Sequence, residues 1–283
     1  FMPQGFVAAL VSNFTSAKFY CSSYGADVLI FKNIKFVGRK FIKYILKKCH
    51  KFTAISDLSF SLINECVKSD EKVMNKGTVI PLPIDDFFFA TKQREHKFEN
   101  NFLYIGRLVD YKGVDLLIES FNLLNKDYHF KLNILGDGVD RESLIKKVKE
   151  YKLENKIFFH GWKDSSEKLN YITKSDVVFV PSIQTKSTME GGPLTLIEAL
   201  SQKKIVICSD SIGYGSYIQD GINGIKFRSG DVSDLVQSVK RYFDLSEFDK
   251  QEMSTSGYKV SHKFKQEEIT AKLYSFLFES SNS

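Results

Sequence analysis

Short apolar runs alternate with amphipathic segments along the chain, and this alternation predicts parallel sheets with crossover helices. The pattern is most regular after residue 100. There we expect strands at 101–107, 130–136, 156–161, 176–182, 204–210 and 224–227, and helices at 113–124, 141–152, 166–175, 231–243 and 265–278. One face of the first of these helices consists of Leu116, Leu117, Ser120, Phe121 and Leu124. This part of the chain therefore has enough βα units for a complete doubly wound domain.

The first part of the chain is less complete. Its patterns predict strands at 17–23, 52–56 and 77–81 and a helix at 38–51, which is about half of a second such domain. The segment 81–100 between the two parts contains two prolines and then a mixed charged stretch. We expect this segment to be a linker.

Composition narrows the class of protein. The 283 residues are 43% hydrophobic and include 25 Phe and 13 Tyr, so we expect a folded chain of one large or two ordinary domains. The formal net charge of +6 suits a partner with phosphates or an anionic surface, and it does not demand nucleic acid.

The cellular location follows from what the sequence contains. The four cysteines form no C-x-x-C pair, which favours reduced thiols in the cytoplasm over a disulfide framework or a zinc site. No apolar run reaches the roughly 18 residues of a membrane span, and no signal peptide opens the chain. The first residue is Phe1 and not Met, so we expect a fragment of a longer protein.

Candidate chemistry begins at "STMEGGPLTLIEAL", residues 187–200, which follows the strand expected at 176–182. Ligands of open α/β folds bind at this carboxyl edge of the sheet. Gly191 and Gly192 allow backbone to approach a ligand closely, and Pro193 suits the first turn of a helix. The amides of Leu194 and Thr195 would then face the cleft and, with the helix dipole, form an anion site suited to phosphate.

Two glutamates flank this turn. Glu198, within the helix, is placed to accept hydrogen bonds from hydroxyls, as acidic residues do for ribose in dinucleotide sites, and Glu190 to meet the group that the phosphates carry. The arrangement predicts a nucleotide-sugar. On this stretch alone a second interpretation is equally open: Glu190 favours a helix N-terminus, and Glu198 is a solvated helix position.

A second loop supports the nucleotide-sugar interpretation. "GRLVDYKG", residues 106–113, joins an expected strand to an expected helix and contains Gly106, Arg107 and Lys112. The two cations are placed to converge on the same cleft and to neutralise a diphosphate leaving group. Alone this would be an ordinary basic loop at a sheet end, but the two loops in one sheet support each other.

Six segments together resemble a known family. They are "IGRLVDYKGVDLLIESF", "LNILGDGVDRESL", "IFFHGW", "SDVVFVPS", "EGGPLTLIEAL" and "DGINGIKF". In this order they resemble retaining glycosyltransferases of group 1, which include bacterial capsule, lipopolysaccharide and mannosyl transferases. The resemblance covers nearly the whole chain. It implies an α/β GT-B fold of two Rossmann-like doubly wound domains with a cleft between them, the N-terminal one truncated.

The resemblance also implies roles for single residues. Arg107 and Lys112 match the diphosphate-binding Arg and Lys, Glu198 matches the ribose-binding Glu, and Glu190 matches the Glu beside the transferred sugar. Arg107, Lys112 and Glu190 are therefore the expected catalytic residues. The expected donor-binding residues are Gly106, Arg107, Lys112, Gly136, Trp162, Glu190, Gly191, Gly192, Leu194, Thr195 and Glu198.

The chain departs from the family pattern at several positions. Gly191, Gly192 and Pro193 stand where the family usually has Gly-Phe-Gly, and Tyr24 in "SYGADVL" stands where it has His. "GYGSYI", residues 213–218, replaces the usual Gly-x-Pro-Glu. The first β-α-β units of the family have no counterpart and would precede Phe1.

We expect neither a metal ion nor a cofactor, because the D-x-D pattern of the other major transferase fold is absent. Asp85 and Asp86 are adjacent and are expected to start a turn, while Arg107, Lys112 and the helix N-terminus take the role of a metal. Segment 32–51 has eight Lys or Arg and no acid. We expect a solvated basic face there, with peripheral attachment to the inner face of the membrane as the second interpretation.

The sequence thus predicts a partial acceptor-side domain at 1–83, a donor-binding domain at 84–263 and a C-terminal helix, 264–283, that packs back on the first domain. The expected reaction is transfer of a glycosyl group from a nucleotide-diphosphate sugar to a saccharide or lipid-linked acceptor, with retention, in cell-surface polysaccharide or glycolipid synthesis. Two alternatives stay open: a nucleotide-sugar epimerase, and a non-catalytic nucleotide-sugar-binding half of a split enzyme.

Overall fold

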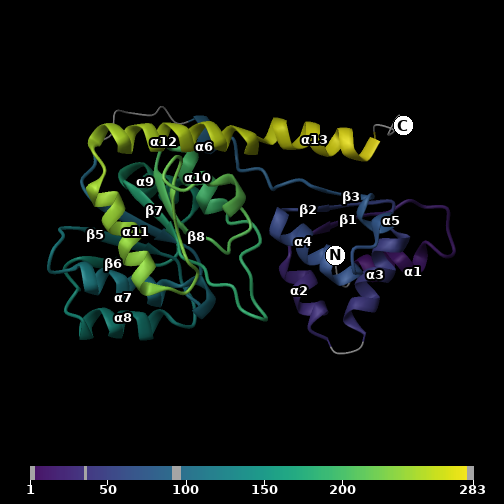
Figure 1. Cartoon of the computed structure of the whole chain (residues 1–283), viewed down its shortest axis with the longest axis horizontal. Helices are drawn as coiled ribbons and strands as arrows, with labels where there is room; N and C mark the ends of the chain where they lie inside the picture. The colour runs from purple at the N-terminus through teal and green to yellow at the C-terminus, as the bar shows by residue number, and fades with distance from the viewer. Residues whose placement is uncertain (1–3, 35–36, 91–96, 279–283) are drawn as a thin grey trace.

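The computed structural model describes residues 4–34, 37–90 and 97–278. Its strands form two parallel sheets, one of three strands in the order β1-β2-β3 and one of six in the order β6-β5-β4-β7-β8-β9. Figure 1 shows these sheets in two lobes, with the last two helices running along the same side of both. The α/β class expected from the alternating pattern is confirmed.

The smaller lobe contains the first sheet and its helices. Its strands are β1 (Tyr20–Ser23), β2 (Lys51–Ala54) and β3 (Gly77–Val79). Its helices are α1 (Gln4–Val11), α2 (Ala26–Lys32), α3 (Gly38–Lys48), α4 (Asp57–Val67) and α5 (Glu71–Met74). The helix expected at 38–51 is too long, because Cys49 is already extended and Lys51 begins β2.

The larger lobe contains the second sheet. Its strands are β4 (Asn101–Ile105), β5 (Lys131–Leu135), β6 (Ile157–Phe159), β7 (Val177–Val180), β8 (Ile205–Ser209) and β9 (Ile225–Phe227). Its helices are α6 (Phe87–Ala90), α7 (Val114–Leu124), α8 (Arg141–Glu150), α9 (Ser165–Lys174), α10 (Leu194–Ser201), α11 (Val232–Asp244) and α12 (Glu247–Ser261). All six expected strands are confirmed to within two residues. The expected buried face of α7 is confirmed too.

Helix α12 was not expected from the sequence. Its buried positions are mostly small or polar, among them Ser254, Gly257 and Ser261, so no apolar period marks it. Gly257 explains how it packs: a Cβ at this position would lie 2.6 Å from the Leu200 side chain of α10. Because Gly257 has no side chain, α12 can lie close to α10.

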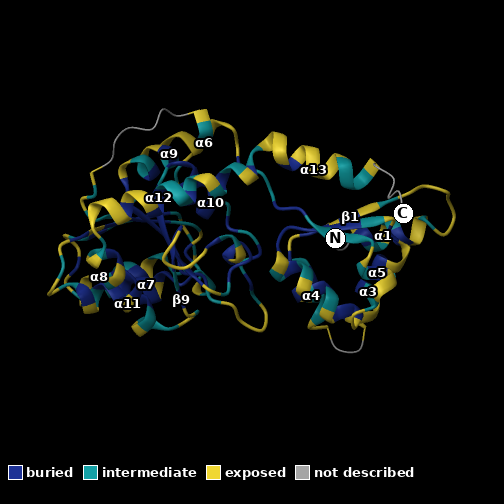
Figure 2. Cartoon of the chain, turned by 45° about the horizontal axis from the view of Figure 1, so that its top comes forward, coloured by how far each residue is buried: buried dark blue, intermediate teal, exposed yellow. Residues whose placement is uncertain are grey.

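Two apolar layers enclose the second sheet. One face packs against α7 and α11, and the other against α9 and α10. Strands β7 and β8 are buried along their whole length, as strands of a sheet covered on both faces must be. In Figure 2 the strands of this lobe are dark, while the helices at the surface show exposed yellow faces. The carboxyl ends of the strands are thus held on a rigid support.

The two lobes are connected at several points. The chain passes between the lobes twice, near Ile84 and near Phe264. These two segments lie side by side, because the Ile84 amide donates to the Phe264 carbonyl at 3.0 Å. After this crossing α13 (Gln266–Phe278) extends along the smaller lobe (Figure 1), where Lys51 donates to the Phe276 carbonyl. Asn33 donates to the Lys186 carbonyl at 2.7 Å. The segment expected to be a linker, 81–100, includes the short helix α6 and residues 91–96, which lie outside the described residues.

No helix within the described ranges has both the length and the hydropathy that crossing a bilayer requires.

Candidate functional site

The two stretches singled out in the sequence meet at the carboxyl edge of the larger sheet. Strands β4 and β7 are hydrogen-bonded neighbours, so the loops that follow them lie side by side. Lys112 from the first loop forms an ion pair with Glu190 from the second. The Ser182 hydroxyl donates to the same carboxylate oxygen at 3.2 Å. Both side chains of this ion pair are largely shielded from solvent, with 18% of the Lys112 side chain and 14% of the Glu190 side chain exposed.

Tyr111 connects the two cations of the first loop. The Arg107 guanidinium donates to the Tyr111 hydroxyl and lies 5.8 Å from the centre of its ring, and the Lys112 ammonium lies 5.5 Å from the same ring. Tyr104 anchors this loop, since its hydroxyl donates to the Arg107 carbonyl at 2.9 Å. Burial raises the pKa of Tyr104, and the nearby Glu190 carboxylate raises it further. Both cations therefore lie against the ring of Tyr111, a residue that the sequence patterns did not single out.

The glycine turn before α10 is closely packed by protein atoms. A Cβ on Gly191 would lie 2.2 Å from the Tyr24 carbonyl oxygen of the smaller lobe, and one on Gly192 would lie 2.7 Å from the Tyr214 ring. The Gly213 amide donates to the Glu190 carbonyl at 2.7 Å. Other parts of the protein approach the turn so closely that a residue with a side chain would not fit at Gly191 or Gly192. They also place Tyr24, the residue that replaces the family His, directly against the turn.

The first turn of α10 has no side-chain cap. Pro193 is the N-cap residue and makes no side-chain hydrogen bond. The amides of a first helical turn have no partner within the helix, so those of Leu194 and Thr195 depend on acceptors outside it. A bound anion would be such an acceptor, and the phosphate site expected here stays a prediction.

Glu198 is one of the most enclosed carboxylates of the larger lobe, with 6% of its surface exposed. Its Oε1 accepts from the Lys168 ammonium of α9 at 2.6 Å, whereas Oε2 is buried and has no hydrogen-bond partner. Burial raises the pKa of Glu198, and the charge of Lys168 opposes this shift. The interpretation of Glu198 as a solvated helix position is therefore wrong.

The remaining expected donor-binding residues lie at the same edge of the sheet. The Gly136 amide donates to the Gly161 carbonyl at 2.8 Å. Gly136 has a φ of +128°, and a Cβ there would lie 1.9 Å from the Gly106 oxygen. The loops after β4, β5 and β6 thus pack in a row. Trp162 follows in the last of these loops and is 74% exposed, a free aromatic surface beside the row.

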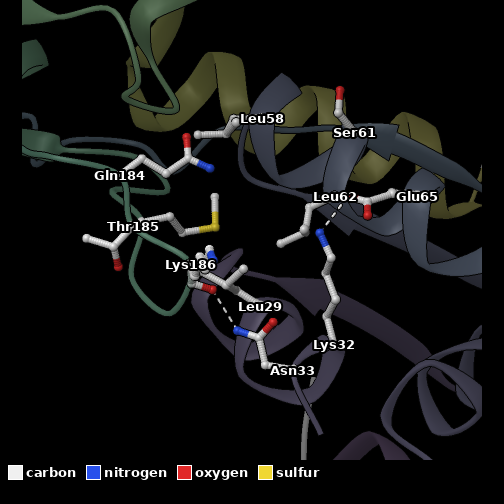
Figure 3. A pocket seen from close by; sticks show the side chains of 11 residues that line it. Leu29, Lys32, Asn33, Leu58, Ser61, Leu62, Glu65, Gln184, Thr185 and Lys186 are labelled. Carbon is white, nitrogen blue, oxygen red and sulfur yellow. Dashed lines mark hydrogen bonds and ion pairs between the residues drawn. The ribbon is translucent and has the colours of Figure 1, made fainter. Parts of the chain in front are cut away.

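A cavity of about 420 Å³ lies between the lobes, next to this site. Figure 3 shows Leu29 and Leu62 of the smaller lobe facing the loop that carries Gln184 and Thr185 of the larger one. Met189, which directly precedes Glu190, also lines it. This cavity could not be predicted from the sequence, because its walls come from α2, α4 and a loop more than a hundred residues later.

The basic segment 32–51 is not a single helix, and several of its charges have partners. Glu65 of α4 pairs with Lys32 at 2.6 Å and with Arg39 at 3.2 Å. Lys43 pairs with Asp70 at 2.9 Å. Acids from a later part of the chain thus neutralise cations that look unpaired in the sequence.

The residues also bear on metal binding. Across residues 4–34, 37–90 and 97–278, no group of three or more His, Cys, Asp or Glu side chains gathers in a way that could hold a metal ion. The Asp85 carboxylate accepts from the Phe87 amide at 2.9 Å, at the start of α6.

Known protein sequences similar to this chain indicate its family. The sequence profile described as "Glycosyl transferases group 1" matches residues 86–260. An uncharacterized glycosyltransferase of Methanocaldococcus jannaschii is 28% identical over 265 residues, which are 93% of this chain and 68% of that protein. Lipopolysaccharide 1,6-galactosyltransferase of Escherichia coli is 26% identical over 77% of this chain, which spans 59% of that enzyme.

Solved structures show the same fold. The Anabaena protein HepE in complex with UDP superimposes with a TM-score of 0.81 at 14% identity, over 96% of this chain and 75% of that one. TarM of S. aureus, in complex with UDP and other ligands, superimposes with a TM-score of 0.76 at 21% identity, over 98% of this chain and 54% of that one. The fold is therefore GT-B, and with the profile match across its larger lobe the chain belongs to the glycosyl transferases group 1 family.

Proposed function

We propose that the protein transfers a glycosyl group from a nucleotide-diphosphate sugar to an acceptor hydroxyl with retention, in the synthesis of a cell-surface polysaccharide or glycolipid. One observation carries this proposal: Lys112 and Glu190 meet beside the uncapped first turn of α10. A cation next to free helix amides suits a diphosphate, and a carboxylate beside them suits the sugar it carries.

The relatives support the substrate class. Besides the galactosyltransferase, they include a poly(ribitol-phosphate) alpha-N-acetylglucosaminyltransferase of Staphylococcus aureus, 26% identical over 71% of this chain. The first name describes transfer of galactose to lipopolysaccharide, and the second describes transfer of N-acetylglucosamine to poly(ribitol phosphate). Because both structural neighbours hold UDP, we take UDP as the first nucleotide to test and a saccharide or lipid-linked hydroxyl as the acceptor.

The chemistry would rest on charge. As the glycosidic bond breaks, negative charge grows on the leaving diphosphate, and fixed cations stabilise that state more than the ground state. Arg107, Lys112 and the amides of Leu194 and Thr195 would bind this group. Glu190 would then orient the sugar and stabilise positive charge that develops on it. No metal is needed for this scheme.

Two other functions use the same site and differ in what they turn over. A nucleotide-sugar epimerase would consume the donor without an acceptor, whereas a non-catalytic binding half would bind nucleotide and turn over nothing. Peripheral membrane attachment through 32–51 has less support than the sequence suggested, because Glu65 and Asp70 pair with three of its cations.

The experiment is thermal unfolding with UDP, GDP, ADP and their nucleosides, followed by product analysis with the matching nucleotide-sugar. A diphosphate at about 100 times its dissociation constant should add roughly 2.7 kcal/mol to the stability, and the nucleosides much less. Lys112→Ala should reduce this shift without abolishing it, while Lys146→Ala, an exposed lysine on α8, should retain it in full. No shift with any of the three diphosphates would overturn the donor site.

A further inference from the structure

The binding of phosphate does not explain the ion pair between Lys168 of α9, which is partly exposed, and Glu198 of α10, which is buried. We propose that Lys168 is a positioning residue for the nucleotide ribose: it holds the Glu198 carboxylate in place as the acceptor of a ribose hydroxyl hydrogen bond. This inference rests on the proposed function, and it adds a residue that neither the sequence motifs nor the comparisons single out.

Lys168 is held from two sides. Its ammonium donates to Glu198 Oε1 at 2.6 Å and lies 5.0 Å from the centre of the Phe88 ring. Gln202, one turn after Glu198, donates to the Phe88 carbonyl and so keeps α6 against α10. A lysine held between a carboxylate and a ring has lost much of its rotamer freedom. It therefore sets the orientation of the carboxylate it touches.

The carboxylate has an unused oxygen. An ionised carboxylate offers about four acceptor sites, but Oε2 of Glu198 is buried and accepts no hydrogen bond. A buried acceptor without a partner is destabilising, so native structures seldom leave one. Lys168 occupies Oε1, so Oε2 is the oxygen left to accept from a ligand. A hydroxyl donor would complete this site, whereas a phosphate, which only accepts, would not.

The charge of Lys168 also favours the ionised form of Glu198, which is the better hydrogen-bond acceptor. Burial raises the pKa of Glu198, and Lys168 is the group that opposes this shift. Without the ammonium, the buried carboxyl group would more readily keep a proton, which turns one of its acceptor positions into a donor and weakens the other oxygen as an acceptor. Lys168 thus acts on the ribose through Glu198 and not by direct contact.

The test compares two ligands by calorimetry at one pH: UDP and its 2′,3′-dideoxy analogue, which lacks the ribose hydroxyls. Lys168→Met should lower the affinity for UDP about tenfold, the loss of one hydrogen bond to a charged group. It should leave the affinity for the dideoxy analogue near that of the wild type. Glu198→Gln should show the same selective loss, and Lys168→Arg, which keeps the charge, should recover most of the affinity. Lys174→Met, at the exposed far end of α9, is the matched control and should bind both ligands normally.

The outcomes separate this inference from the proposed function. Equal losses for UDP and the dideoxy analogue, or no loss, would overturn the role of Lys168 while the donor site stands. If the wild type binds none of UDP, GDP and ADP, the proposed function fails and this inference with it. If GDP or ADP binds in place of UDP, the corresponding dideoxy diphosphate is used. Should Lys168→Met not fold, Lys168→Gln takes its place, since it keeps a hydrogen-bond donor but not the charge.

Discussion

Lys112 and Glu190 are 78 residues apart in the sequence and form an ion pair at the carboxyl ends of the adjacent strands β4 and β7. From the sequence we expected separate partners for them, the diphosphate for Lys112 and the sugar for Glu190. In the structure each is the partner of the other. Binding of a diphosphate would therefore have to draw Lys112 away from Glu190, or to share it.

This pairing leads to a prediction for Glu190→Gln. Removing the carboxylate charge frees Lys112 and takes away a negative charge beside the diphosphate site. The variant should bind bare UDP at least as tightly as the wild type, although its rate of transfer should fall. Calorimetry with UDP and steady-state kinetics measure the two effects, and Glu150→Gln, an exposed glutamate on α8, is the control. Weaker UDP binding by Glu190→Gln would contradict the proposed division of roles.

Lys112→Met should lower the turnover number more than it weakens donor binding. The ammonium is expected to act on charge that grows during bond cleavage, and loss of one such group typically reduces the rate about a hundred- to a thousandfold. Arg107→Met should behave similarly, and the double variant should be less than additive, because both cations serve one charge. Kinetics at saturating acceptor decide the point. A raised Michaelis constant for the donor with unchanged turnover would leave Lys112 as a binding group only.

Gly191→Ala should destabilise the contact between the lobes. The new Cβ would lie 2.2 Å from the Tyr24 carbonyl oxygen, a backbone atom that has little freedom to move, and such overpacking typically costs about 1–3 kcal/mol. Thermal unfolding should show a lower midpoint, and the rate of transfer should fall too. The control is Gly215→Ala, where the nearest atoms to a Cβ lie 3.6 Å away. Equal stability of both variants would show that the turn relaxes without harm.

Lys204 should make the stability depend on alkaline pH. Its ammonium donates to the Thr173 carbonyl at 2.8 Å, and burial lowers its pKa from 10.5 to about 8, although Asp176 opposes the shift. Between these two values the unfolded chain binds more protons than the folded one, so stability rises with pH there. Below pH 8 both states are protonated, and the unfavourable contribution stays constant.

The measurement is the free energy of unfolding of the wild type and of Lys204→Met between pH 7 and 10. Relative to the variant, the wild type should gain about 2 kcal/mol between pH 8 and 10. Using the difference between the two proteins removes the effect of other groups that titrate in this range. Parallel pH profiles would mean that Lys204 has an ordinary pKa in the folded state.

Much of the larger lobe was predictable, because its strands and helices carry the periods on which such prediction depends. Strands β7 and β8 are continuous apolar runs, and α7 has a clear apolar face. Where no period exists, prediction failed: α12 buries serines and a glycine. Helix α4 was missed as well, although its Ser56 cap, which accepts from the Ser59 amide, is a local signal that the sequence contains.

Strand ends and helix starts can be read from the residue pattern alone, and this pattern placed Arg107, Lys112, Glu190 and the first turn of α10 at one edge of a sheet. This information is local, since a strand, a turn and a helix follow each other along the chain. Which of these side chains touch depends instead on how the whole chain folds. The strand order brings β4 beside β7 and so pairs Lys112 with Glu190. The packing of α9 on α10 likewise pairs Lys168 with Glu198, because contacts between distant segments depend on how the elements pack and not on their spacing in the sequence.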